Sequence, residues 1–241
     1  LALGGPSRGK GTPEQRTDAP LGSTASQAAG GWREKLHQIA ARAAEDKEVA
    51  FRSLAHLVDI DALREAHRRI RKDGVAGVDG QTAEEYGREL EANLASLLAR
   101  LKAKTYRPPP VRRAYIPKAN GMPRAIGIPT FEDKIVQRAY ATVIEAIYEQ
   151  DFMSCSYGFR PGRSAHDALE ALWRECMNQN VRWVLEADIR DFFGTLEHAH
   201  LREFLSRRIT DGGVRRLVSH WLEAGVLEEG QHQHPTAGTP Q

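Results

Sequence analysis

Apolar residues recur at helical spacing through the N-terminal part of the chain and predict a series of helices. The first should begin near Trp32, and a second is expected over residues 59–72, with Asp59 or Asp61 available as its cap. A third helix, with a stripe of leucines, should run over residues 82–104. Three consecutive prolines follow and forbid its continuation, because proline lacks the N–H that a helix needs.

Beyond the prolines the spacing shortens to two residues and predicts a β-hairpin. Residues 111–117 and 122–128 read as strands joined by a turn that contains an Asn-Gly pair, which is a strong hairpin signal. Helical spacing returns over residues 131–149 and 164–178. The apolar face of the second of these helices, which includes Leu169, is expected to lie inside the protein.

A short strand and two further helices complete the pattern. Residues 182–189 alternate in a way that predicts a strand with Asp188 near its end. Helices are expected at about 198–208 and 212–224, followed by a polar strand-and-turn segment around Gln231. The order of elements indicates an α+β fold: helices first, a hairpin, more helices, and a strand whose sheet partners are not evident.

The first residues differ from the rest of the chain in composition. Residues 1–31 are rich in Gly, Ser, Pro, Thr and Ala, and they have too few large apolar side chains to offset the entropy of ordering. We therefore expect three parts: a disordered segment over 1–31, a helical part over 32–105, and a second part over 106–241. Leu1 and Gln241 make both ends look cut, so we expect a fragment.

Composition and charge leave the class of partner open. The chain has 241 residues, of which 41% are hydrophobic and 27% charged, and its net charge is only +2. This balance neither requires nor excludes a nucleic acid. The two cysteines lack metal-ligand spacing and are expected to be reduced thiols in a cytoplasmic protein. No apolar run approaches the ~20 residues of a membrane helix, so no membrane partner is expected, and the four tryptophans are expected in the core.

The predicted hairpin carries a candidate binding site for a polyanion. Arg112, Lys118 and Arg124 are spaced six residues apart, and an even offset along extended chain keeps side chains on one face. Three cations on one face suit a triphosphate. The alternative is an edge hairpin whose charges keep it from pairing with other chains.

Asp188 is a candidate metal ligand. An aspartate that ends an apolar strand is held rigidly while its carboxylate faces outward, and Mg²⁺ prefers hard oxygen donors of this kind. The alternative is that Asp188 caps the turn after the strand.

Several strings of residues resemble the group II intron reverse transcriptases and their bacterial relatives, and they occur in the order of that family. They are Gly77-Val78-Asp79-Gly80, Tyr106-Arg107-Pro108, Ile116-Pro117-Lys118, Pro123-Arg124-Ala125-Ile126-Gly127-Ile128-Pro129, Tyr157-Gly158-Phe159-Arg160-Pro161-Gly162-Arg163-Ser164-Ala165-His166, Glu186-Ala187-Asp188-Ile189-Arg190-Asp191-Phe192-Phe193 and Gly238-Thr239-Pro240-Gln241. The resemblance runs from about residue 50 to the last residue.

The resemblance implies both a fold and an activity. It makes residues 32–105 the family's helical N-terminal extension, and residues 106–241 the fingers and first part of the palm of a right-hand polymerase, helix-rich with a β-hairpin and a truncated palm sheet. The implied enzyme is an RNA-directed DNA polymerase, a nucleotidyltransferase of a mobile element. Its partners would be an RNA template, a DNA primer and deoxynucleoside triphosphates, with Mg²⁺ as cofactor. As a maturase it would also bind intron RNA.

The resemblance also assigns roles to the residues of the hairpin and of the predicted strand. Asp188 would be the first of the catalytic aspartates that hold two metal ions, and the carbonyl of Ile189 would join the same metal. Arg112, Lys118 and Arg124 would grip the phosphates of the incoming deoxynucleotide.

Four more residues receive roles from the resemblance. Phe193 would be the steric gate that clashes with a 2′-hydroxyl, and Gln241 would lie near the nucleotide and template. Arg160 and Arg163, on a polar loop, would contact the template backbone. The alternative for these two arginines is a local pairing with a carboxylate.

The chain departs from the family in two respects. The Tyr-Ala-Asp-Asp motif, which supplies the remaining catalytic carboxylates, is absent from the 241 residues, so we expect this fragment to be inactive alone. Phe193 is followed by Gly194, where relatives often carry an acidic or amide residue, which puts the local turn in question.

Two alternative functions remain open. One is a non-catalytic RNA-binding or splicing module, for which the basic face of the second helix would be suited; its cations are Arg64, Arg68, Arg69, Arg71 and Lys72. The ordinary interpretation of that face is a solvated helix surface. The other alternative is a degenerate gene fragment with no function of its own.

Overall fold

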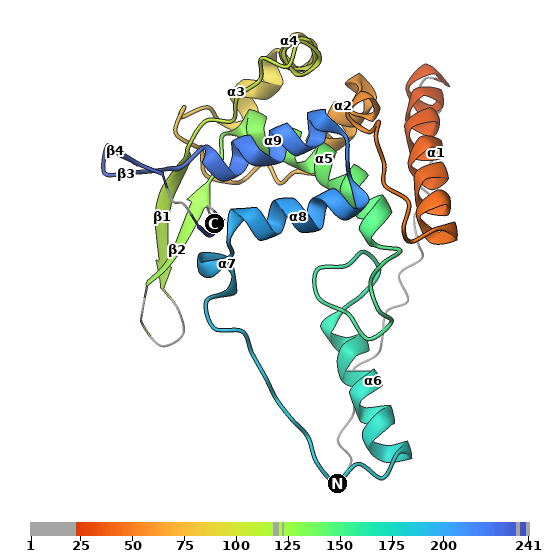
Figure 1. The fold of residues 1–241 in the computed structure, drawn as a ribbon. Coiled ribbons are helices and arrows are strands. Elements are labelled where there is room, and N and C mark those ends of the chain that lie inside the picture. The colour runs from red at the N-terminus through yellow and green to blue at the C-terminus, as the bar shows by residue number, and fades with distance from the viewer. Residues whose placement is uncertain (1–22, 118–120, 122, 235–236, 240–241) are drawn as a thin grey trace, which may run out of the picture.

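The computed structural model describes residues 23–117, 121, 123–234 and 237–239 (Figure 1). The elements before the hairpin are α1 (Ser23–Glu45), the short 3₁₀ helix η1 (Ala55–Leu57), α2 (Ile60–Arg69), α3 (Ala83–Arg88) and α4 (Leu90–Lys102). Those that follow are β1 (Val111–Pro117), β2 (Pro123–Ile128), α5 (Phe131–Tyr148), α6 (Ala165–Asn178), α7 (Phe192–Thr195), α8 (His198–Arg208), α9 (Gly212–Glu223), β3 (Val226–Glu228) and β4 (Gln231–Gln233). The expected helices near 60–69, 131–148, 198–208 and 212–223 are confirmed.

Helix α5 lies at the centre of the core. It packs against α1, α2 and α3, and α9 runs across it in Figure 1. Thr130 caps the start of α5, and the helix buries an almost continuous apolar face; its fully enclosed side chains include Ile135, Val136, Val143 and Ile147. Each such side chain contributes roughly 1.5–3 kcal/mol when it leaves water. The core therefore joins the N-terminal helices to the second part of the chain.

The caps of the N-terminal helices follow from their sequences. Asp59 accepts hydrogen bonds from the backbone N–H groups of Asp61 and Ala62, as its position before the second helix predicts. Thr82 and Glu85 form a reciprocal capping box at the start of α3.

The prediction of one continuous helix over residues 82–104 is wrong. The chain leaves the helical conformation at Glu89, where φ is −122° and ψ is 40°, and resumes as α4. The side-chain amide of Asn93 donates to the carbonyl of Tyr86 at 2.9 Å, which satisfies an acceptor at the end of α3. The break lets the phenol ring of Tyr86 turn into the core against Phe131.

The predicted hairpin is confirmed and belongs to a small mixed sheet. The strand order is β2-β1-β3-β4, with β1 antiparallel to β2, β1 parallel to β3, and β3 antiparallel to β4. The polar segment around Gln231 forms β4, as expected. The sheet stands at one side of the helices, and α7 is drawn to the right of β2 in Figure 1.

The region from α6 to α7 departs most from the predictions. The expected strand over residues 182–189 is wrong for this structure, because the chain there is extended but pairs with no strand among the described residues. The apolar face of α6 is also exposed, with Leu169 at 63% and Trp173 at 64%, and Trp183 is 92% exposed. Helix α6 projects away from the core in Figure 1. A strand needs a ladder partner and an amphipathic helix needs a packing surface, and none of the described segments supplies either.

Two of the four tryptophans do lie in the core. Trp32 is 4% exposed and donates its indole N–H to the carbonyl of Leu57, and Trp221 packs partly buried against the same cluster. Cys155 and Cys176 are both free, in agreement with the expectation of reduced thiols.

Candidate active site

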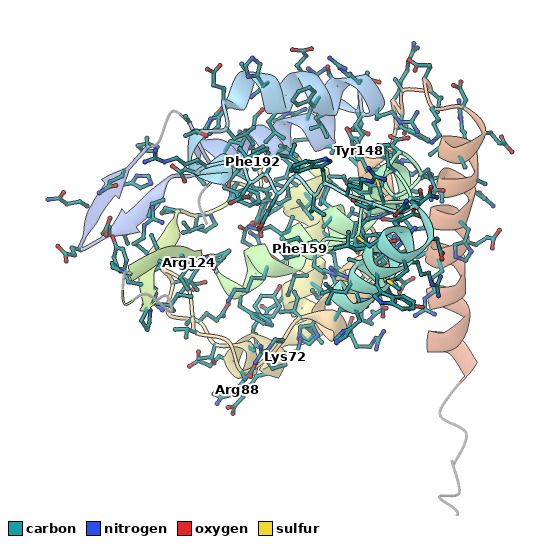
Figure 2. The ribbon with its side chains drawn as sticks, turned by 90° about the horizontal axis from the view of Figure 1, so that it is seen from below. Lys72, Arg88, Arg124, Tyr148, Phe159 and Phe192 are labelled. Atoms are coloured by element: carbon teal, nitrogen blue, oxygen red, sulfur yellow. The ribbon has the colours of Figure 1, made fainter. Side chains whose placement is uncertain are left out.

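The hairpin presents two of its three predicted cations on one face. Arg112 lies opposite Ile128, and Arg124 lies opposite Ile116, so the register places both arginines on the same side of the ribbon. Four residues separate their positions along the strand, which corresponds to roughly 13 Å. Arg124 extends from the edge strand of the sheet (Figure 2). Lys118 lies outside the described residues.

Arg112 is fixed by the glycine-rich turn over residues 74–80. Its guanidinium donates two hydrogen bonds to the carbonyl of Ala76, at 3.2 Å from Nε and 2.8 Å from Nη2. Gly77 lets the same turn pass close to the start of α5, because a Cβ there would come within 2.6 Å of the backbone of Thr130. Burial lowers the pKa of the neighbouring Lys134, with Arg112 adding to the effect and Asp79 opposing it. The turn therefore holds the Arg112 guanidinium in place at the base of the hairpin.

Asp188 and Ile189 lie in the extended segment before α7. Both are exposed, with Ile189 at 68%. A carboxylate and a backbone carbonyl are the hard oxygen donors that suit Mg²⁺. However, the described part of the chain brings no group of three acidic, histidine or cysteine side chains together in a way that could hold a metal. The donors of this pair have the right chemistry for Mg²⁺, but their number is too small to complete a site.

The turn after Asp188 is tightly built around Gly194. Asp191 adopts the left-handed conformation, with φ at 49° and ψ at 42°, and its carbonyl accepts from the N–H groups of Gly194 and Thr195. A Cβ at Gly194 would lie 2.5 and 2.6 Å from the two carboxylate oxygens of Asp191. Glycine at position 194 departs from the family, but the turn is formed in this structure. The turn requires glycine there, because a larger residue would clash with the carboxylate of Asp191.

The segment that precedes Gln241 packs against Phe193. The N–H of Thr239 donates to the carbonyl of Phe193 at 2.9 Å, and His198 Nε2 lies 2.6 Å from the carbonyl of Gly238. The ring of Phe193 is half exposed and meets that of Phe192 edge to face. Gln241 itself lies outside the described residues. The two predicted nucleotide-site segments, far apart in sequence, are therefore neighbours in space.

Arg160 is held inside its own loop. Its guanidinium pairs with Glu149 at 2.6 Å, donates to the carbonyls of Met153 and Ser156, and lies over the ring of Phe152. Its side chain is only 6% exposed. This is the local carboxylate pairing that the sequence left as an alternative.

Arg163 is less enclosed than Arg160. It donates to the carbonyl of Ser154 at 2.8 Å and lies over the ring of Tyr157, with its side chain half buried. It keeps donors directed toward solvent, because only one of its nitrogens makes a hydrogen bond among the described residues.

The basic face of α2 is largely neutralised by neighbouring acids. Arg64 pairs with Glu91 at 2.8 Å, and Arg68 and Arg69 each lie 2.7 Å from Glu65. Hydrogen bonds from Arg68 and Arg69 lower the pKa of Glu65 to about 2, although burial opposes the shift. These pairs match the solvated helix surface more closely than a free phosphate-binding face.

A buried hydrogen-bond centre, which sequence reasoning missed, fixes the entry to the hairpin. Asp133 is 1% exposed and accepts from the Tyr106 hydroxyl, the Trp221 indole and the Gln137 amide, each at 2.8 Å. Burial raises the pKa of Asp133 despite these three donors. No local pattern signals the contact, because Trp221 is 88 residues away in sequence. It joins α9 to α5 and to the segment that leads into β1.

None of the helices in the described ranges is long and apolar enough to cross a membrane.

Comparison with known proteins identifies several relatives. Residues 116–241 match the family model described as reverse transcriptase (RNA-dependent DNA polymerase). The chain is 36% identical over 215 residues to Protein YkfC of Escherichia coli (strain K12), covering 86% of this chain and 56% of that protein. It is also 36% identical over 198 residues to the group II intron-encoded protein LtrA of Lactococcus lactis subsp. cremoris, covering 80% of this chain and 32% of that protein. Over 97 residues it is 30% identical to nuclear intron maturase 2, mitochondrial, of Arabidopsis thaliana, covering 40% of this chain and 13% of that protein. The chain therefore spans about half the length of the first relative and a third of the second.

Proposed function

Because this chain belongs to the reverse transcriptase family, we propose that it supplies the fingers and first part of the palm of an RNA-directed DNA polymerase of the group II intron type. The proposed reaction is attack by a primer 3′-hydroxyl on the α-phosphate of a deoxynucleoside triphosphate, with pyrophosphate as the leaving group. The template would be RNA. The observation that carries the proposal is the cationic face of the hairpin, where Arg124 lies within the part of the chain that matches the family and Arg112 lies four residues before that part begins.

The proposed triphosphate site is built on that face. Arg112 is fixed by two hydrogen bonds to Ala76, so its charge is placed before a ligand arrives, and Arg124 stands on the same side of the edge strand. A bound triphosphate would be held at two points of the ribbon, and we propose Lys118, which follows β1 in the sequence, as a third cation. Preorganised cations of this kind stabilise the charge that develops on a phosphoryl group during transfer.

Phe193 is the proposed gate of the same site. Its half-exposed ring sits on a short turn that Gly194 and Asp191 fix, and the N–H of Thr239 donates to its carbonyl. A ring held in this way would exclude a 2′-hydroxyl by contact and so favour deoxynucleotides. Gln241 follows two residues after Thr239 and would lie beside the nucleotide.

Asp188 and the carbonyl of Ile189 are the proposed metal ligands. Mg²⁺ bound there would neutralise phosphate charge and favour ionisation of the primer hydroxyl. The set needs further carboxylates, which the family carries in a Tyr-Ala-Asp-Asp motif that these 241 residues lack. We propose that the remaining ligands come from a part of the protein that corresponds to the uncovered length of the relatives.

The unpacked region is consistent with that proposal. Residues 182–189 have the alternation of a strand but no partner within the described chain, and the apolar face of α6 is exposed beside them in sequence. Further palm strands would pair with this segment and cover the apolar side chains.

A primer-extension assay tests the proposed activity. The 241-residue chain, given Mg²⁺, a primed RNA template and deoxynucleotides, should not extend the primer. A longer protein that carries this chain together with a complete palm should do so. Robust extension by the 241 residues alone would contradict the requirement for further carboxylates.

A second candidate function is binding of intron RNA as a splicing cofactor. The relatives named as intron-encoded protein and intron maturase favour it. An Asp188→Ala change in the longer protein separates the two functions, because it should abolish polymerisation and leave RNA binding within about twofold. RNA binding through phosphate contacts should weaken steeply as salt rises, and a flat salt profile would count against it.

A further inference from the structure

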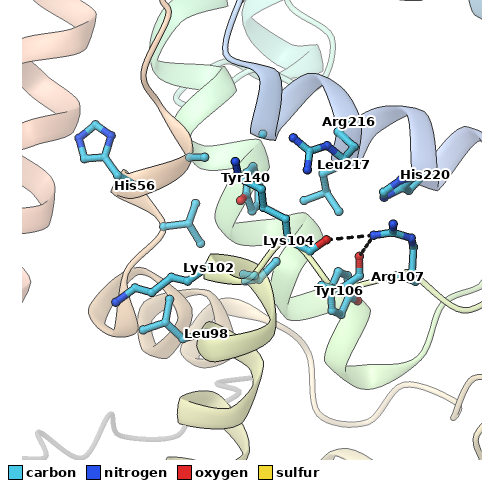
Figure 3. A pocket seen from close by; sticks show the side chains of 14 residues that line it. His56, Leu98, Lys102, Lys104, Tyr106, Arg107, Tyr140, Arg216, Leu217 and His220 are labelled. Carbon is cyan, nitrogen blue, oxygen red and sulfur yellow. Dashed lines mark hydrogen bonds between the residues drawn. The ribbon is translucent and has the colours of Figure 1, made fainter.

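A cleft of about 460 Å³ lies between η1, the end of α4 and the start of α9, apart from the hairpin face (Figure 3). Its walls are apolar and aromatic; the side chains that form them include Val58, Leu98, Leu101, Tyr106, Tyr140 and Leu217. The volume is in the range of ordinary small-molecule sites. Nothing in the proposed polymerase reaction uses this cleft.

The rim of the cleft is positively charged. Lys102 is the last residue of α4, Lys104 and Arg107 lie in the segment that follows it, and Arg216 lies on α9. Figure 3 shows Arg107, Arg216 and His220 gathered at one end, with Lys102 at the other. Arg107 donates to the carbonyls of Lys104 and Tyr106 and is thereby held over the opening.

The four cations of this rim differ from those of α2 in having no acid beside them. In the described part of the chain none of them forms an ion pair with a carboxylate, and the lining residues include no aspartate or glutamate. The α2 arginines, in contrast, are matched by Glu65 and Glu91. Burial lowers the pKa of His220, with Arg107 and Arg216 adding to the effect and Glu223 opposing it. An unneutralised set of cations around an apolar cavity is a site for a ligand with one anionic and one apolar end.

The interior of the cleft also carries a few polar groups, so the less charged end of the ligand should itself have hydrogen-bonding atoms. The hydroxyl of Tyr140 makes no hydrogen bond within the described chain, although Tyr140 is only 5% exposed. His56 and His220 add imidazole nitrogens at opposite sides of the cleft. A purely aliphatic ligand would leave these groups unsatisfied, which is costly in an enclosed site.

We propose that this cleft binds an unpaired nucleotide, with the base between the aromatic and leucine side chains and the phosphates on the rim formed by Lys102, Lys104, Arg107 and Arg216. Unpaired bases are commonly recognised by stacking on aromatic and histidine rings and by hydrogen bonds to their edges. The nucleotide can belong to a single-stranded RNA or be a free mononucleotide, since both present the same base and phosphate. Membership of a family that uses RNA favours the first source, but the proposal does not depend on Asp188 or on polymerase activity.

Neighbouring arginines on α9 provide a matched test. Arg215 and Arg216 are both exposed, but only Arg216 lines the cleft. Affinity for a fluorescent single-stranded RNA 12-mer should fall at least about tenfold in Arg216→Glu, because a charge-assisted contact becomes a repulsive one. Arg215→Glu changes the net charge by the same amount, and its affinity for the 12-mer should fall less than about threefold. Tyr140→Phe keeps the ring and should weaken binding by a few fold.

Further ligands separate the two sources and define failure. In one outcome, adenosine monophosphate displaces the 12-mer from the wild type and from Arg215→Glu but less from Arg216→Glu. That result would support a site that also accepts free mononucleotides. Binding of the 12-mer with no displacement would support an RNA nucleotide alone. Equal losses in the two arginine variants, or equal affinity for a blunt RNA duplex, would overturn the proposal. Circular dichroism of each variant checks that the helices are intact.

Discussion

Asp211 joins the N-terminal helices to α9, and its replacement by alanine tests how strongly the two parts of the chain are coupled. One carboxylate oxygen accepts from the N–H groups of Gly213 and Val214 at 2.7 and 3.0 Å, which caps α9. The other accepts from Leu54 and Ala55 at 2.6 and 3.0 Å, from a segment more than 150 residues earlier in the chain. The residue is 7% exposed.

The expected loss of stability follows from these four contacts. Removal of a helix cap costs about 1 kcal/mol. The N–H of Leu54 is buried and would be left without an acceptor, which costs about 1–3 kcal/mol, and that of Ala55 beside the cleft would lose less because water can reach it. We expect Asp211→Ala to lower the free energy of unfolding by about 3–4 kcal/mol.

Urea denaturation followed by circular dichroism measures the change. Asp59→Ala is the matched control, because Asp59 caps α2 through Asp61 and Ala62 and accepts from no backbone N–H of the second part among the described residues. That variant should lose about 1 kcal/mol. A loss in Asp211→Ala no larger than in Asp59→Ala would refute the coupling.

The same carboxylate predicts a dependence on pH. Burial alone would raise the pKa of Asp211, but the four backbone donors hold it below its ordinary value of 3.8. A lowered folded-state pKa means that the stabilisation is complete above about pH 5 and declines as pH falls through 4, where the unfolded chain takes up the proton first. Asp211→Asn should show a smaller decline over that interval.

Three further substitutions test contacts that position the candidate site. Tyr106→Phe removes one of three donors to Asp133 and should cost about 2 kcal/mol in urea unfolding; an unchanged midpoint would mean that the contact is dispensable. Gly77→Ala places a Cβ 2.6 Å from the backbone of Thr130 and should cost about 1–3 kcal/mol, while Ala at the open position Gly87 should not destabilise the chain. Arg160→Met leaves Glu149 unpaired and should cost about 2 kcal/mol without a change in the salt dependence of RNA binding; a reduced salt slope would instead make Arg160 a phosphate contact.

Features of the fold with local causes could be predicted from the sequence. The hairpin followed from its alternation and its Asn-Gly turn, and the cap at Asp59 followed from its place before an apolar face. The shared face of Arg112 and Arg124 needed only the period of a strand. In each case the residues that determine the structure lie within a few positions of one another.

Features with distant partners could not be predicted. The contacts of Asp211 with Leu54 and of Asp133 with Trp221 join residues 157 and 88 positions apart, and no local pattern encodes them. The strand expected over 182–189 failed for the related reason that alternation describes a surface that needs a partner. The four cations around the cleft come from the end of α4, the segment after it and α9, and only the fold brings them together.

Single-nucleotide extension of a primed RNA template tests whether Asp188 is the metal-binding carboxylate that we propose for this reverse transcriptase chain. In a protein with a complete palm, Asp188→Ala should lower the rate at least ~1,000-fold, because a metal ligand contributes several kcal/mol to the transition state. Glu186→Ala, a nearby exposed acid, should lower it less than ~10-fold. Extension by Asp188→Ala at a rate similar to that of Glu186→Ala would contradict the claim.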